Sequence, residues 1–198
     1  MNRTLAALAA AAVAVSANAV LVIDQDPGNP PGSENILFND PSLISKGLLV
    51  QGMTNENFLF VDFFDAGEDL VTARASVMAV DGGMTQLSVA MNDPTLGISA
   101  YRFNLNALAS GDVTINVFDH GVLSLAETFA LKENGPNWFR VYGTEGEAVS
   151  VISFDSTVEI GAVRNNHVIA VPNPVPEPSG LVALGFGLAA IVSLRKRS

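Results

Sequence analysis

Between residues 58 and 171 the chain consists of short segments in which apolar and polar residues alternate, and this pattern restricts the folds that it can adopt. Alternation with period two places every second side chain on the same face of a β-strand. The clearest case is 101–106, where Tyr101, Phe103 and Leu105 alternate with an arginine and two asparagines. The pattern predicts strands at 58–64, 71–79, 87–91, 101–106, 113–117, 138–142, 149–154, 157–163 and 167–171.

Turn signals separate these segments, and periodicity of helix length is limited to the two ends of the chain. Asp-Gly-Gly at 81–83, Asn-Asp-Pro at 92–94 and Asn-Gly-Pro at 134–136 are combinations that favour turns. Strands that follow one another without helices between them cannot form parallel crossovers, so the sheets should be antiparallel. The sequence therefore predicts an all-β domain, an antiparallel β-sandwich of jelly-roll type, with a closed barrel as the alternative.

The first 19 residues have the composition of a secretory signal peptide. Arg3 is their only charged residue, 5–15 is an apolar run, and Ala17 and Ala19 flank an asparagine in an A-x-A cleavage site. We predict that signal peptidase removes residues 1–19. The mature chain would then begin with a flexible lead-in, 20–33, because this stretch holds three prolines and two glycines.

The last 27 residues have three parts in a fixed order. Prolines at 172, 174, 176 and 178 form an extended spacer. Residues 180–194 have no charge, and as a helix they would cover about 22 Å, which is less than the apolar core of a bilayer at about 30 Å. Three cations follow at 195–197 and can reach the cytoplasmic headgroups. These parts predict a transmembrane helix that anchors the chain in the inner membrane.

The combination of a Pro-Glu-Pro motif, a short apolar helix and a basic end resembles the PEP-CTERM sorting signal of Gram-negative bacteria. The resemblance covers residues 172–198 and implies recognition by an exosortase, a membrane-embedded cysteine transpeptidase that cleaves near the motif. It also implies that the anchored precursor becomes a protein of the cell surface or extracellular matrix. A plain C-terminal anchor is the alternative. The residues that carry the resemblance are Pro176, Glu177, Pro178, Arg195, Lys196 and Arg197.

The charge distribution limits the partners of the domain between the two ends. All 20 acidic residues but only six of the ten lysines and arginines lie within 20–178, which leaves 14 excess negative charges there. Nucleic acid and anionic membranes repel such a surface, so neither is an expected partner. The chain has no cysteine, which excludes disulfides and thiol chemistry.

Several short motifs within 34–171 look like a recurrent family of PEP-CTERM ectodomains. They are NILFN at 35–39, GMTN at 52–55, FNLN at 103–106, and a Val-Arg pair at 163–164 before the last strand. That family is a set of β-sandwich proteins of largely unassigned function. The resemblance therefore implies a sandwich ectodomain at 34–171 and provides no catalytic residue.

The two histidines, His120 and His167, do not indicate a catalytic or zinc site. No serine or carboxylate stands near them at a spacing typical of a Ser-His-Asp triad, although such a triad could form in space. Zinc needs three or four ligands, and the chain offers two distant histidines without cysteine.

The acidic stretch 62–69 is a candidate site for structural Ca²⁺, because oxygen atoms are the ligands that calcium prefers. Its spacing differs from that of an EF-hand, and the alternative is an exposed acidic loop that aids solubility. No other cofactor is expected. The four carboxylates are Asp62, Asp65, Glu68 and Asp69, and other loop residues with oxygen ligands are Asp24, Asp26 and Asn29.

Trp138, Arg140 and Tyr142 are the candidate glycan contacts. They share parity in the segment 138–142 and are therefore expected on its outward face, while Phe139 points inward. Aromatic rings in such a position can stack on the apolar C–H faces of sugars. The alternative is that the single tryptophan belongs to the core, as large aromatic residues usually do.

Taken together, these features predict an exported, non-enzymatic surface or matrix protein that is associated with extracellular polysaccharide and has a structural or adhesive role. A carbohydrate-binding module with a defined glycan ligand is the second hypothesis. A secreted hydrolase is the third, because glycosidases need paired carboxylates whose proximity the sequence does not reveal.

Overall fold

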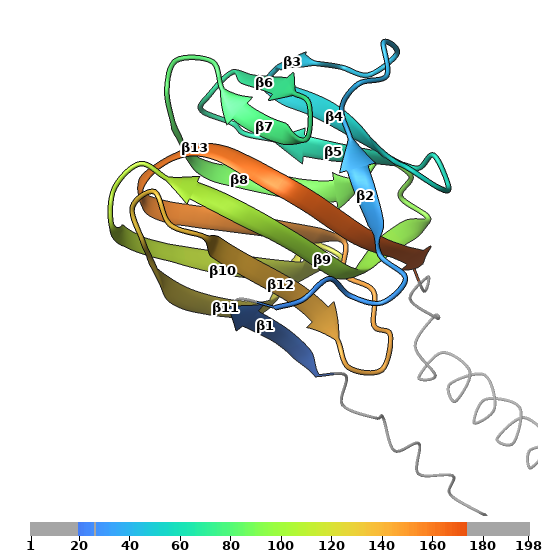
Figure 1. The fold of residues 1–198 in the computed structure, drawn as a ribbon. Coiled ribbons are helices and arrows are strands. Elements are labelled where there is room, and N and C mark those ends of the chain that lie inside the picture. The colour runs from blue at the N-terminus through green and yellow to red at the C-terminus, as the bar shows by residue number, and fades with distance from the viewer. Residues whose placement is uncertain (1–19, 26, 174–198) are drawn as a thin grey trace, which may run out of the picture.

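The computed structural model describes residues 20–25 and 27–173, and this part of the chain consists of β-strands joined by turns and loops (Figure 1). It contains thirteen strands and no helix within the described residues. Every pairing between these strands is antiparallel, so the predicted all-β antiparallel fold is confirmed. The strands are β1 (Leu21–Gln25), β2 (Glu34–Leu37), β3 (Lys46–Gly47), β4 (Leu49–Thr54), β5 (Phe60–Phe64), β6 (Leu70–Ala73), β7 (Ser76–Ala79), β8 (Met84–Met91), β9 (Leu96–Ala107), β10 (Gly111–Asp119), β11 (Val122–Leu131), β12 (Asn137–Gly143) and β13 (Val151–Pro172).

The longest strand, β13, organises the fold because it pairs with neighbours along both of its edges. Along one edge its first part pairs with β10 and its last part with β9, so that β9 and β10 lie end to end. Along the other edge it pairs in turn with β8, β7 and β2. Its register shifts at several points, and such bulges let a strand bend. The three strands predicted at 149–154, 157–163 and 167–171 are therefore one bent strand.

The pairings form one hydrogen-bonded network that includes a closed circuit. The circuit runs from β13 through β8, β5, β4 and β2 and returns to β13. Strands β12 and β1 extend the network beyond β9, and β11 extends it beyond β10. Strand β13 belongs to the closed circuit and also pairs with β9 and β10 outside it. The strands therefore form one connected network and do not separate into two independent sheets.

Alternating side chains from these strands fill one hydrophobic core. On β9, Tyr101, Phe103 and Leu105 are at most 2% exposed, as the alternation predicts. The ring of Phe139 on β12 is fully buried and lies 5.7 Å from the ring of Phe103 and 5.4 Å from that of Phe129, measured between centroids. Aromatic contacts of this kind add to the stability gained by burying apolar area.

The strand prediction differs from the structure in further places. Residues 21–25, predicted within the flexible lead-in 20–33, form β1, because Ile23 enters the core and the segment pairs with β12. The predicted strand 71–79 is split into the β6–β7 hairpin at Arg74, whose φ of 56° turns the chain. The predicted strands do not include β2, β3, β4 or β11, and the side chains of β11 are mostly exposed on both faces.

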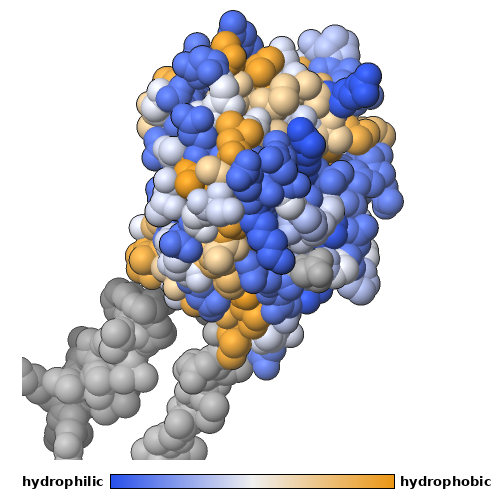
Figure 2. Space-filling view, turned by 60° about the vertical axis from the view of Figure 1, so that its left-hand side comes forward, coloured by the Kyte–Doolittle hydropathy of each residue, from blue (hydrophilic) through white to orange (hydrophobic). Residues whose placement is uncertain are grey.

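The surface is mainly hydrophilic on the face that Figure 2 presents, where the hydrophobic residues form small, separate groups. This agrees with the excess of 14 negative charges in residues 20–178. Repulsion between such surfaces favours solubility over unspecific association.

Some of the predicted features lie outside the described residues. These are the signal peptide 1–19, with Ala17 and Ala19, and the part of the sorting segment from residue 174 onward. Pro172, predicted as the start of the spacer, is the last residue of β13. Within 20–25 and 27–173, no helix has the length and apolar character needed to cross a membrane.

Candidate functional site

Strand β12 presents the three candidate glycan contacts on its outward face. Trp138, Arg140 and Tyr142 are half-buried, whereas Phe139 and Val141 between them are 0% and 1% exposed. The predicted parity of this strand is therefore confirmed. Trp138 lies outside the core, so the alternative placement of the single tryptophan is wrong.

Each of the two aromatic rings on this face has a guanidinium group over it. The guanidinium carbon of Arg102, on the neighbouring strand β9, lies 3.7 Å from the centroid of the Trp138 ring. That of Arg140 lies 4.4 Å from the centroid of the Tyr142 ring, and its Nη2 atom forms an ion pair of 2.6 Å with Asp24 on β1. These cation–π contacts orient the rings and leave less ring surface for a ligand.

Arg102 also holds part of the predicted lead-in against the sheet. Its Nε atom donates a hydrogen bond of 2.9 Å to the carbonyl of Pro27, and its Nη1 atom donates one of 2.7 Å to Oδ1 of Asn29. His167 on β13 is paired with Arg102 in the sheet, and burial together with the positive charge of Arg102 lowers the pKa of His167. At neutral pH the histidine is therefore a neutral group on this face.

Two open cavities adjoin the outward face of β12. One, of about 270 Å³, borders Trp138; the other, of about 380 Å³, borders Arg140 and Tyr142. Both have polar and apolar walls, and such cavities can accept a sugar-sized group. The first is also lined by Gln25, Ala130, Lys132, Pro136 and Asn137, and the second by Pro30, Pro31, Ser99, Ala100, Gly143, Gly146 and Ile169.

The acidic stretch 62–69 is held by hydrogen bonds of the protein itself. Asp62 on β5 accepts hydrogen bonds from Gln51 and Asn92, at 2.8 and 3.0 Å. Asp65 is 1% exposed, and its Oδ1 atom accepts hydrogen bonds from Gln86 and from the backbone N–H groups of residues 67 and 68. The two side chains lie on opposite faces of the chain, since Asp62 points outward and Asp65 inward.

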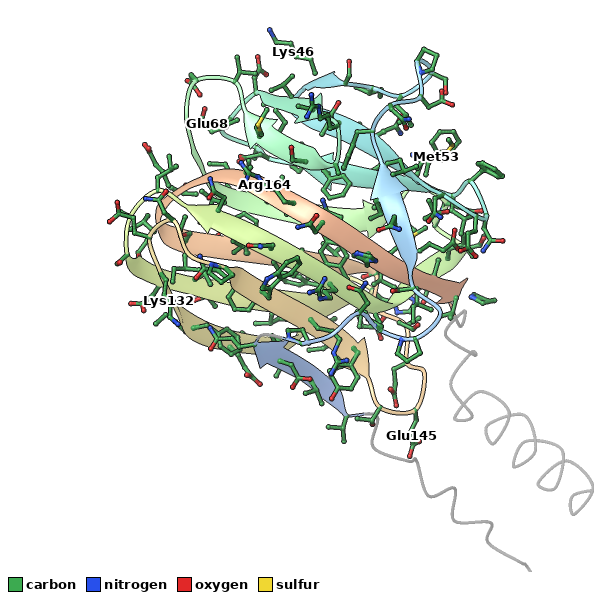
Figure 3. The ribbon with its side chains drawn as sticks, viewed as in Figure 1. Lys46, Met53, Glu68, Lys132, Glu145 and Arg164 are labelled. Atoms are coloured by element: carbon green, nitrogen blue, oxygen red, sulfur yellow. The ribbon has the colours of Figure 1, made fainter. Side chains whose placement is uncertain are left out.

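Glu68 and Asp69 lie on the loop between β5 and β6, where Figure 3 marks Glu68. The negative charge of Asp81 nearby, followed by desolvation, raises the pKa of Glu68. Asp69 is exposed. Within the described residues no three acidic or histidine side chains converge on a point that could hold a metal ion, so the structure does not assemble the candidate Ca²⁺ site from these four carboxylates.

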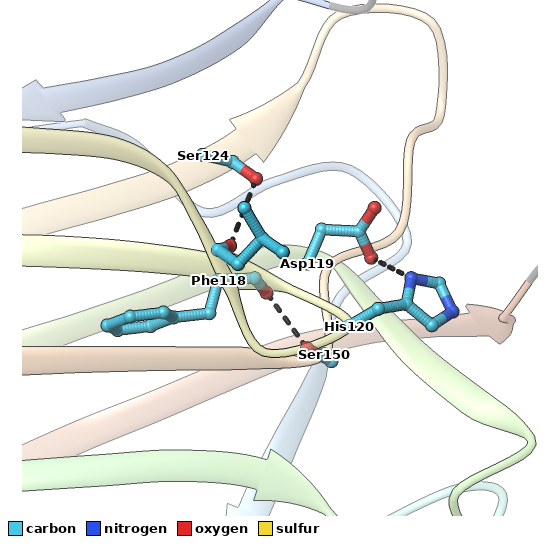
Figure 4. Close-up of polar contacts among 6 residues, drawn as sticks. Phe118, Asp119, His120, Ser124 and Ser150 are labelled. Carbon is cyan, nitrogen blue, oxygen red and sulfur yellow. Dashed lines mark hydrogen bonds and ion pairs between the residues drawn. The ribbon is translucent and has the colours of Figure 1, made fainter.

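The environment of His120 shows no arrangement typical of a nucleophilic site among the described residues (Figure 4). The Nδ1 atom of His120 lies 2.6 Å from Oδ1 of Asp119 in an exposed turn. The hydroxyl groups of the two nearby serines donate to backbone carbonyls instead of contacting the imidazole: Ser124 to the carbonyl of residue 122, at 3.4 Å, and Ser150 to the carbonyl of residue 118, at 3.0 Å.

One exposed aromatic residue, Phe58, has a position that the sequence pattern does not predict. The pattern assigns it to a strand at 58–64, but β5 begins at Phe60 and Phe58 lies in the turn after β4. Its φ is 56° and it is 64% exposed. The Asn-Glu-Asn run at 55–57, which is typical of a turn, is the signal that could have placed it there.

The C-terminal residues define the class of the protein. Residues 174–197 match the PEP-CTERM protein-sorting motif, which marks exported proteins with a membrane-anchored precursor that exosortase processes. The chain is thus a PEP-CTERM domain-containing protein, and the recognition based on Pro176, Glu177, Pro178 and the basic end is confirmed. A comparison with curated proteins finds no match.

Proposed function

We propose that this protein is sorted by exosortase to the cell surface or extracellular matrix of a Gram-negative bacterium, where it has a structural or adhesive, non-catalytic role in association with extracellular polysaccharide. The observation that carries the proposal is the sorting motif at 174–197, which begins two residues after the end of β13. Residues 173–179 connect β13 to the apolar run that begins at 180, and seven residues span at most about 25 Å, so the ectodomain of the anchored precursor would stay close to the membrane until cleavage.

The character of the ectodomain supports a structural role. Its strands are joined into one network by β13, and such long-range pairing resists local opening. We propose that the network forms the two layers of a jelly-roll-like sandwich, which β13 joins: one layer holds β2, β4, β5 and β8, and the other holds β1, β9, β10, β11 and β12. The excess of 14 negative charges in 20–178 suits a protein that stays soluble outside the cell, and stability without disulfides is independent of the redox state there.

Carbohydrate binding through β12 is the second candidate function. It is favoured by the two aromatic rings on the outward face, Trp138 and Tyr142, and by the cavities beside them. Arg140 could donate hydrogen bonds to sugar hydroxyls there. Replacing Trp138 by alanine would abolish glycan binding under this hypothesis.

The sorting proposal is tested by replacing Pro176, Glu177 and Pro178 together with alanine in the full chain. We expect export to continue, while the precursor accumulates in the inner membrane because exosortase no longer recognises it. Immunoblots of the inner membrane, surface and medium fractions measure this distribution. Val175→Ala, within the spacer and next to the Pro-Glu-Pro triplet but not part of it, is the control and should be processed normally. The proposal would be refuted if the mature form of the triple variant reached the surface in normal amounts.

A further inference from the structure

A small apolar surface lies at the end of the sheet where β2, β4 and β5 run side by side. Leu37, Met53 and Phe60 are directly opposite one another in register, with Leu37 36% and Phe60 40% exposed. Figure 3 marks Met53 at this end of the molecule, which is also the end where β13 finishes. Exposed apolar groups that gather in this way are typical of interaction sites.

Phe58 projects from the turn beside this surface in a strained backbone conformation. Its φ of 56° lies in the left-handed region, which is unfavourable for a residue with a bulky side chain. The ring is nevertheless 64% exposed, so the strain is not offset by burial in the core. Residues held in such conformations cluster at functional sites, because the surrounding structure must maintain them.

The surrounding structure fixes this turn through the buried carboxylate of Glu34 on β2. Its Oε2 atom accepts hydrogen bonds from the backbone N–H groups of Glu56 and Asn57, at 2.9 and 2.8 Å, and its Oε1 atom accepts one from the side chain of Asn57, at 2.6 Å. Thr54 Oγ1 accepts a further hydrogen bond from the backbone of residue 59. The ring is therefore presented by a rigid turn, and little conformational freedom is lost on binding.

The groups around the ring indicate the chemistry of the partner. Asn55 and Asn57 lie in the same turn as Phe58; Oδ1 of Asn55 accepts a hydrogen bond from the backbone N–H of Asn35, and the amide nitrogen of Asn57 donates to Glu34. The amide nitrogen of Asn55 and Oδ1 of Asn57 can therefore still donate to and accept from hydroxyls. The turn carries the acidic residue Glu56 and no lysine or arginine. A flat apolar ring in the same turn as two amide groups suits a pyranose, which has an apolar C–H face and hydroxyls at its rim. The charge of the ectodomain disfavours an acidic polymer or an anionic bilayer.

We propose that the Phe58 tip, defined as residues 54–60, binds a neutral polysaccharide, with the Phe58 ring stacked on a sugar ring. This site deepens the proposed function, on which it rests, because it names the class of polysaccharide that the protein contacts. It is separate from the candidate on β12, since residues 54–60 connect β4 to β5.

The test uses the mature protein and the extracellular polysaccharide of the producing strain, separated by anion exchange into neutral and acidic fractions and immobilised. Phe58→Asn and Phe58→Gly remove the ring, while both replacements tolerate a positive φ and keep the turn. We expect wild-type protein to bind the neutral fraction and both variants to bind at least tenfold more weakly. Phe58→Trp should bind at least as well as wild type. Leu123→Asn, at an exposed apolar residue on β11, is the control and should bind like wild type.

Melting curves of all variants establish that the fold is intact, and Phe58→Gly should melt no lower than wild type. Equal binding of wild type and Phe58→Asn would overturn the proposal, as would binding to the acidic fraction alone or to neither fraction. The proposal would also be overturned if Phe58→Asn kept polysaccharide binding but lost self-association or binding to phosphatidylcholine vesicles. Correct sorting together with polysaccharide binding that Phe58→Asn leaves unchanged would refute this site alone, whereas Phe58-dependent binding by a protein that exosortase does not process would refute the sorting proposal alone.

Discussion

Replacing Glu34 by alanine should destabilise the ectodomain, because the carboxylate of this β2 residue holds the turn between β4 and β5. The Glu34 side chain is 9% exposed and accepts three hydrogen bonds from residues 56 and 57. The donors of these three hydrogen bonds lie in a turn that faces solvent. No other side chain can therefore replace the Glu34 carboxylate as their common acceptor. Alanine would leave the turn attached only through Thr54 and Asn55.

The size of the effect follows from these contacts. A hydrogen bond to a charged group contributes about 1.5–3 kcal/mol, but water can replace the lost acceptor in this exposed turn, and the three bonds are not additive. We therefore expect Glu34→Ala to lower the free energy of unfolding by about 2–3 kcal/mol, which corresponds to a fall in Tm of about 5–10 °C for a domain of this size. Glu34→Gln should cost about 1 kcal/mol, because its amide keeps one acceptor while losing the charge.

The same interaction predicts a dependence on pH. Desolvation raises the pKa of Glu34, but the hydrogen bonds from Asn57 and Glu56 outweigh it and hold the pKa below its ordinary value of 4.5. The folded state therefore binds this proton more weakly than the unfolded state. The stabilisation is fully present above about pH 4.5 and is lost as the pH falls through the lowered value in the folded protein.

Urea denaturation of wild type, Glu34→Ala and Glu34→Gln at pH 7 and pH 3 measures both effects. Glu56→Gln is the matched control, because only the backbone of Glu56 takes part in the turn, and it should be within about 0.5 kcal/mol of wild type. The reasoning would be refuted if Glu34→Ala were as stable as this control. It would also fail if the difference between wild type and Glu34→Gln were the same at both pH values.

Three further substitutions test the packing of the strands by urea denaturation. Phe139→Ala should lower the free energy of unfolding by about 3–5 kcal/mol, because a fully buried ring is lost. Trp138→Ala should lower it by about 1 kcal/mol. Equal losses of stability would contradict the assignment of the two faces of β12. Gly52→Ala should cost about 1–3 kcal/mol, since a Cβ at this position would lie 2.3 Å from Cγ2 of Ile36 and 2.8 Å from Cε1 of Phe38. An unchanged stability would show that β2 can move away from β4 without loss.

Much of this protein could be predicted from local patterns. The end of the chain is a sorting signal that depends on the type and order of its residues. It can therefore be identified without knowledge of the fold, from Pro176, Glu177 and Pro178, the apolar run and the basic end. Alternation likewise predicts which side chains of 101–106 and 138–142 are buried, because the two faces of a strand differ in polarity wherever one of them packs on a core. These features are local, and the sequence determines them by itself.

The tertiary structure decided the features that depend on pairing over long distances. Nothing in 149–171 indicates that three short segments form the single strand β13, because its bends arise from bulges between partners more than 50 residues apart. The acidic run 62–69 gives no sign that Asp62 and Asp65 point to opposite faces and are bound by Gln51 and Gln86. The same holds for Phe58: its exposure and its backbone strain depend on Glu34, a residue of another strand, whose carboxylate can reach the turn only when β2 and β4 are paired.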